Sequence, residues 1–138
     1  RPTAGEIYDM FLVVAKVFIT AGFHDPDSVP EFQQICPDEA SPEQVEAWEV
    51  AREGASRLAW KPYMYDPSLP NLLHRVKNLP TQIIWGKQDG ILPLSAVESY
   101  QQAISGSKLS VLDDCGHHPE IEKPGEFIDL VRPFLSGS

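Results

Sequence analysis

The chain has 138 residues and a formal net charge of −9 at pH 7, a length that suits one modest domain with one core. Hydrophobic residues make up 42% of it and charged residues 22%, as in ordinary globular proteins. The negative charge repels phosphate backbones and anionic headgroups, so we expect neither nucleic acid nor a membrane surface as a partner.

The first predicted element is a helix over residues 5–22. Its main apolar stripe recurs at helical spacing and consists of Ile7, Met10, Phe11, Val14, Val17, Phe18 and Ala21. Leu12, Val13 and Ile19 add apolar side chains outside this stripe, so the helix is predicted to be buried on more than one side. Lys16 interrupts the apolar run, which is too short to cross a bilayer.

A second helix has clear start and stop signals. Residues 24–42, before it, are rich in proline and acidic side chains and are predicted to form a loop. Ser41 can cap the helix, Pro42 fits its first position, and Gln44 stands three residues after the cap. Pro62 requires the helix to end before it. One apolar face consists of Val45, Trp48, Ala51, Ala55, Leu58 and Ala59.

Strands and helices alternate in the second half of the chain. Residues 69–77 predict a short amphipathic helix, and alternating strands and helices follow over residues 81–86, 94–104, 108–114 and 124–135. This order indicates two parallel strands joined by a crossover helix, so the predicted class is α/β. The last helix is predicted to turn inward Phe127, Leu130, Val131, Phe134 and Leu135.

Two parallel strands make an incomplete sheet. Parallel sheets bury both faces, and a sheet of only two strands is marginal by itself. The residues before 69 supply helices and no convincing strand. We therefore expect the two strands to extend a larger sheet that this chain does not contain.

One reactive side chain follows each predicted strand. Asp89 lies in the loop GKQDG after the first strand, and His117 lies in the loop CGHH after the second. Because the carboxyl ends of parallel strands meet at one edge of a sheet, we expect these side chains to meet. A carboxylate there accepts the Nδ1 proton of the imidazole and fixes its tautomer. Nε2 is then free to act as a general base.

These two loops resemble the C-terminal part of the α/β-hydrolase superfamily. The first half of the resemblance is the strand, acid and proline of IIWGKQDGILP. The second is a G-H-x-P-x-x-E-x-P-x-x-F pattern formed by Gly116, His117, Pro119, Glu122, Pro124 and Phe127. The resemblance covers about residues 80–135 and implies that Asp89 is the triad acid and His117 the triad histidine. It assigns Glu122 and Pro124 a structural role at the start of the last helix.

The resemblance also implies parts of the enzyme that this sequence lacks. No G-x-S-x-G nucleophile turn is present, and the family places the nucleophile and the oxyanion hole before the acid and the histidine. We expect residues 1–68 to be the helical cap and residues 69–138 to be the end of the hydrolase core. The first residue is Arg1 and not Met, which suggests an excised piece. The expected partner is an N-terminal half that carries the nucleophile, without which the chain is expected to be inactive.

The implied reaction is hydrolysis of a small or medium apolar ester, with no cofactor. Epoxide hydrolysis, dehalogenation and C–C hydrolysis share the same frame, and the nucleophile is open among Ser, Asp and Cys. Aromatic and apolar side chains of the cap are candidates to line the substrate site, although each is also a candidate for the core. They are Phe11, Phe18, Trp48, Trp60, Tyr63, Met64 and Tyr65.

Two other interpretations of the histidine loop are weighed beside this one. A metal site would use Asp113, Asp114, Cys115, His117, His118, Glu120 and Glu122, but neighbouring side chains diverge and no recognised ligand spacing is present. A surface loop with idle histidines is the second. His118 is expected to point away from its neighbour, because successive side chains of an extended chain diverge.

The cysteines and the overall role complete the predictions. Cys36 and Cys115 are far apart and are expected to be free thiols in a reducing, cytoplasmic compartment. Cys115 is expected to be a small buried residue and not a nucleophile. A non-catalytic binding or assembly module, derived from the same fold, is the alternative to an enzyme.

Overall fold

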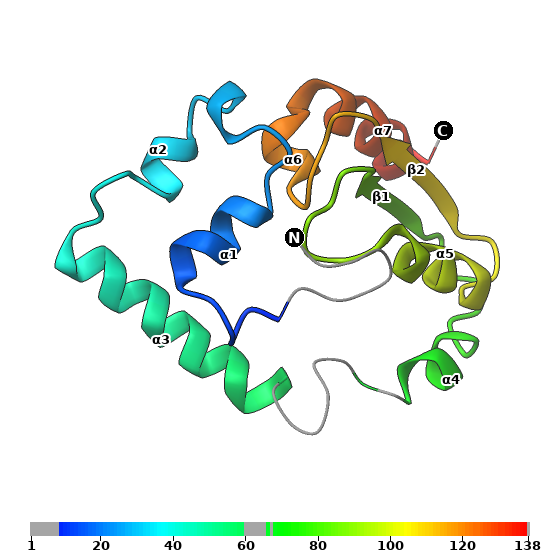
Figure 1. Ribbon diagram of the computed structural model, residues 1–138. Coiled ribbons are helices and arrows are strands. Elements are labelled where there is room, and N and C mark those ends of the chain that lie inside the picture. Colours follow the sequence, from blue (N-terminus) through cyan, green and yellow to red (C-terminus); the bar gives the residue numbers. More distant parts are fainter. Residues whose placement is uncertain (1–8, 60–65, 67, 138) are drawn as a thin grey trace.

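The computed structural model describes residues 9–59, 66 and 68–137. Figure 1 shows a helical part, with α1, α2 and α3, beside a second part that holds the two strands, α5 and α7. The predicted α/β class is confirmed. In chain order the elements are α1 (Ala15–Ala21), η1 (Pro26–Ser28), α2 (Phe32–Ile35), α3 (Pro42–Ala59), α4 (Leu69–Leu73), β1 (Gln82–Gly86), α5 (Leu94–Ala103), β2 (Lys108–Leu112), α6 (Pro119–Glu122) and α7 (Pro124–Ser136).

Helix α1 is shorter than predicted. The prediction of a helix over residues 9–14 was wrong. Asp9 forms a local turn there: its side-chain Oδ1 accepts the Phe11 N–H at 2.8 Å, and its carbonyl accepts the Leu12 N–H at 3.2 Å. Side-chain bonds of this kind compete with a helix. Val14 is extended, with φ −69° and ψ 152°. Residues 5–8 of the predicted helix lie outside the described residues.

Helix α3 begins as predicted, and its described part runs to Ala59. The Gln44 N–H donates to Ser41 Oγ at 3.3 Å, which satisfies one of the free amides at the helix start. Trp48 packs against a small buried cluster of the helical part, whereas Leu58 is 91% exposed. The predicted loop before α3 instead contains η1 and α2, and α2 supplies Phe32 to that cluster. Its members are Phe23, Val29, Phe32 and Cys36.

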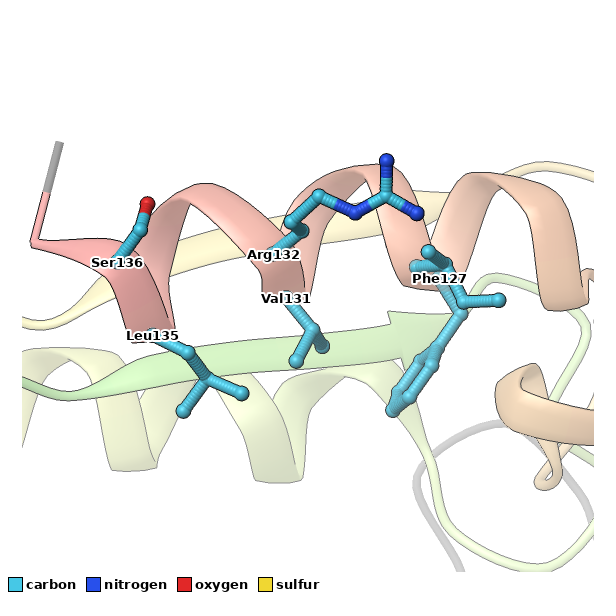
Figure 2. A pocket seen from close by; sticks show the side chains of 6 residues that line it. Phe127, Val131, Arg132, Leu135 and Ser136 are labelled. Carbon is cyan, nitrogen blue, oxygen red and sulfur yellow. The ribbon is translucent and has the colours of Figure 1, made fainter.

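Strands β1 and β2 form the predicted parallel pair. Their register runs from Gln82 opposite Lys108 to Gly86 opposite Leu112. Helix α5 connects them and buries Val97 completely. Figures 1 and 2 show α5 and α7 on opposite faces of this pair. Within the described residues no other strand joins it.

The inward face predicted for α7 is only partly covered. Phe127, Leu130 and Val131 are half-buried, but Phe134 is 37% and Leu135 77% exposed. Figure 2 shows Phe127, Val131 and Leu135 projecting from one side of the helix. They line an open hollow of about 490 Å³ with Ile128, Arg132 and Ser136. This face therefore extends beyond what two strands can cover.

None of the described helices is both long enough and apolar enough to cross a bilayer.

Helix α4 ends at Leu73, earlier than predicted, and Asn78 beyond it has a left-handed φ of 59°. The short helix α6, directly after the two histidines, was not predicted.

Candidate active site

The loops that follow β1 and β2 are bonded to each other. The Lys87 N–H donates to the Leu112 carbonyl, and the Gln88 N–H donates to the Cys115 carbonyl, each at 2.9 Å. The Gln88 side chain returns the contact, because its Oε1 accepts the Cys115 N–H at 3.2 Å. These bonds hold the two loops in one fixed arrangement at the carboxyl edge of the sheet, as expected for adjacent parallel strands.

Asp89 uses both of its carboxylate oxygens. Oδ1 accepts the N–H groups of Ile91 at 2.8 Å and Leu92 at 3.0 Å, and Oδ2 lies 2.8 Å from Nδ1 of His117. The side chain is 4% exposed. Burial alone raises the pKa of Asp89, but the hydrogen bonds from His117, Leu92 and Ile91 outweigh it and hold that pKa below its usual value. The carboxylate is therefore ionised at neutral pH and orients the imidazole.

His117 is held from two sides. Because an ionised carboxylate only accepts, Nδ1 is the donor in its bond to Asp89. The backbone N–H of His117 donates to the Gly22 carbonyl at 2.6 Å. The bond to Asp89 raises the pKa of His117; burial opposes this, and the charges of Asp89, Glu120 and Glu122 add to it. Among the described residues, no group bonds Nε2, and the side chain is 33% exposed. That nitrogen is available to take a proton.

Comparisons with known proteins identify the family. A family model of the alpha/beta hydrolase fold matches residues 22–124. The chain belongs to the α/β-hydrolase fold family. A stretch of 69 residues is 41% identical to the monoacylglycerol lipase ABHD6 of Mus musculus and 36% identical to that of Homo sapiens, and it takes in 50% of this chain and 20% of each relative.

Two solved structures share the fold of this chain. The 2-hydroxy-6-oxo-6-phenylhexa-2,4-dienoate hydrolase of Rhodococcus sp. strain RHA1 superposes with a TM-score of 0.64 at 22% identity, over 88% of this chain and 43% of that one. An esterase of Exiguobacterium antarcticum gives 0.60 at 21% identity, over 88% and 41%. At these identities the likeness is one of fold. The chain spans less than half the length of either protein.

The second histidine of this chain of the α/β-hydrolase fold family faces elsewhere. The His118 ring lies 4.9 Å from the Phe23 ring, and its Nδ1 lies 3.4 Å from Glu120 Oε1. The rings of His117 and His118 are 5.3 Å apart and nearly perpendicular. Of the two histidines, His117 bonds Asp89 and His118 does not, so the adjacent imidazoles have different environments.

The other acidic and thiol groups of the loop also have separate surroundings. Asp113 pairs with Lys87 at 2.6 Å, and Asp114 lies 3.8 Å from His24. Among the described residues, no three His, Cys, Asp or Glu side chains gather as a metal would need. Cys115 is fully buried, and burial raises the pKa of its thiol to about 12. It is the buried small residue that was predicted, and it is protonated at neutral pH.

Glu122 does not have the role that was expected for it at the start of α7. Helix α7 begins with Pro124 after Lys123, which gives it no side-chain cap. The Glu122 carboxylate instead accepts the N–H groups of Gly116 at 2.8 Å and His24 at 2.7 Å. The spacing of the motif gave no sign of these partners.

A cavity of about 250 Å³ lies beside His117. Its walls are Ile84, Trp85, Gly86, Asp89, His117, Pro119, Glu120 and Phe127. Of the cap residues proposed as substrate lining, Phe11, Phe18 and Trp48 are not among these walls, and Trp48 packs in the helical part instead. Trp60, Tyr63, Met64 and Tyr65 lie outside the described residues. Contact of any of the seven with substrate stays a prediction.

Trp85, Pro119, Glu120 and Phe127 were not predicted to border the site. The available signal was their position in the sequence. Trp85 lies in β1, Pro119 and Glu120 lie in α6 directly after the two histidines, and Phe127 lies in α7.

Gly86 lets the loops that follow β1 and β2 approach each other. A Cβ at this position would lie 1.8 Å from the Gly116 carbonyl oxygen and 2.5 Å from that of Cys115. Backbone atoms cannot move aside without distorting both loops. We therefore expect Gly86→Ala to lower the free energy of unfolding by about 3 kcal/mol. The matched control is Gly54→Ala in α3, where nothing lies within 4 Å of the new Cβ. That change is expected to add about 0.5–1 kcal/mol. Urea unfolding of both variants checks this; equal midpoints would contradict it.

Proposed function

We propose that this chain supplies the acid and the histidine of a nucleophile–histidine–acid triad in a carboxylic-ester hydrolase. The observation that carries this proposal is the 2.8 Å bond between Asp89 Oδ2 and His117 Nδ1. Its setting adds support, since Asp89 is buried and fully bonded while Nε2 of His117 is available. An acid that fixes a histidine tautomer in this way is how a general base is prepared for acyl transfer.

In this mechanism Nε2 of His117 takes the proton of the nucleophile as that group attacks the ester carbonyl. The imidazolium that forms is stabilised by the Asp89 carboxylate, which stays ionised. His117 then gives the proton to the departing alcohol, leaving an acyl group on the nucleophile. A water molecule, deprotonated by the same Nε2, releases the acid and restores the starting state.

The nucleophile comes, in this proposal, from a completing N-terminal half of the hydrolase core. Three features of the described residues support such a partner. No strand covers the edge of β1 away from β2, the apolar face of α7 is open, and the cavity beside His117 lies along β1. Further strands added at β1 would cover the face of α7 and bring a nucleophile turn to His117.

The substrate we propose is a small or medium apolar ester, such as a monoacylglycerol with a medium acyl chain. Ile84, Trp85, Pro119 and Phe127 give the cavity beside His117 a largely apolar wall. The relatives matched at 36–41% identity are named monoacylglycerol lipases, which favours an acyl ester over an epoxide or haloalkane. The two free, buried thiols support a reducing compartment such as the cytoplasm.

Ester hydrolysis by the completed enzyme tests this function. We expect a protein that joins the upstream half to this chain to hydrolyse a medium-chain monoacylglycerol, and the chain alone to give only the background rate. A fatty-acid release assay on both proteins checks this, with styrene oxide and a chloroalkane as competing substrate classes. Turnover of those alone would contradict the ester proposal. No turnover of any substrate by the joined protein would favour the non-catalytic module.

A further inference from the structure

Glu122 joins two segments that are far apart in the chain. Its Oε1 accepts the Gly116 N–H at 2.8 Å, and its Oε2 accepts the His24 N–H at 2.7 Å across 98 residues. Gly116 directly precedes His117, and His24 lies just beyond α1 in the helical part. One carboxylate therefore ties the loop that carries the histidine to the end of the α1 segment.

A third bond and tight packing reinforce this junction. The His117 N–H donates to the Gly22 carbonyl at 2.6 Å. A Cβ on Gly116 would lie 2.5 Å from that carbonyl oxygen, 2.8 Å from Glu122 Oε1 and 2.8 Å from the His24 nitrogen. Gly22 and Gly116 are buried. The junction thus has little room to slide, and its two carboxylate bonds are of the stronger, charge-assisted kind.

We propose that Glu122 is a positioning residue for the hydrolytic reaction: its carboxylate holds the loop of His117 against residues 22–24, so that the imidazole stays aligned with Asp89. This inference rests on the proposed function. It also makes the helical part, through Phe23 and its buried cluster, a direct support of the histidine. A displacement of that part would move His117 through the bonds of Gly22 and His24 to the histidine loop and Glu122.

The side chain's chemistry allows a sharp test. Glu122→Gln keeps the shape but offers one oxygen in place of two, so one of the two N–H groups faces an NH₂. Glu122→Asp keeps the charge but is too short to reach both. The matched control is Glu120→Gln, which removes an equal charge from the same short helix; Glu120 bonds neither backbone segment. The charged or titratable groups that face His117 are Asp89, Glu120, Glu122 and the neighbouring His118.

The readouts are the NMR titration of the His117 ring and amide hydrogen exchange in this chain. We expect both Glu122 variants to lower the pKa of His117 more than Glu120→Gln does, and to speed exchange at Gly116 or His24 at least tenfold. If charge alone matters, Glu120→Gln will lower that pKa at least as much, Glu122→Asp will leave it unchanged, and exchange will stay slow; that pattern overturns the proposal.

Turnover gives a second readout in the completed enzyme. We expect kcat to fall on the order of 10- to 100-fold in Glu122→Gln, with KM within about twofold, because the base is misplaced while the substrate site is intact. An unchanged kcat would overturn the positioning role. The titration and the exchange need no turnover, so a protein that hydrolyses no ester would fail the proposed function without deciding the role of Glu122.

Discussion

We expect the change His117→Ala to lower kcat for ester hydrolysis by the completed enzyme by roughly 10⁴- to 10⁶-fold. The reason is that, among the described residues, His117 is the one histidine whose Nδ1 bonds Asp89, which leaves its Nε2 to act as the base. In the proposed mechanism, neither the nucleophile nor the deacylating water would then lose its proton to a base. Steady-state kinetics on a chromogenic ester of a medium-chain acid measures the loss.

The matched control for this change is His118→Ala. Its ring lies beside Phe23 and Glu120, and its Nδ1 lies 3.4 Å from Glu120 Oε1 and not against Asp89. We expect this variant to keep kcat within about fivefold of the unmodified enzyme. The two substitutions remove the same atoms from adjacent positions, so the comparison isolates the role of the imidazole at 117. The opposite ranking would move the base to His118 and overturn the triad assignment.

We expect the change Asp89→Asn to lower kcat by up to about 10⁴-fold while leaving KM nearly unchanged. The amide keeps one oxygen, which Ile91 and Leu92 need for their N–H groups. Its NH₂ then faces Nδ1 of His117, which favours the tautomer with the proton on Nε2, and that tautomer cannot act as the base. Kinetics on the same ester measures the effect.

Asp113→Asn is the control for this loss of charge. Asp113 follows β2 in the neighbouring loop and pairs with Lys87 on the surface. We expect this variant to keep kcat within about twofold, because surface pairs contribute little. Equal losses in Asp89→Asn and Asp113→Asn would mean that general charge near the loops, and not the bond to His117, governs the rate.

The meeting of Asp89 and His117 could be predicted because it follows from strand order. Each residue follows an apolar strand, and parallel strands end at one edge. The start of α3 was equally visible, since Ser41 and Pro42 are local signals. In contrast, the turn set by Asp9 was missed because a single side-chain bond overrode a continuous apolar pattern.

The contacts between distant segments could not be predicted. Nothing near Glu122 in sequence indicates that it bonds His24, because that contact depends on how the helical part docks on the histidine loop. The packing of Trp48 against the buried cluster of the helical part has the same origin. A periodic pattern identifies an apolar face but not its partner, and the open face of α7 shows this most clearly.

The pairing of Asp89 with His117 is tested most directly by NMR titration of the His117 ring in this chain, with and without Asp89→Asn. We expect the pKa of His117 to lie above its ordinary value of 6.5, because Asp89 favours the protonated ring, and to fall in the variant. The imidazole is then neutral, and able to act as a base, only above that raised pKa. A pKa at or below 6.5 that stays the same in Asp89→Asn would contradict the pairing and the triad built on it.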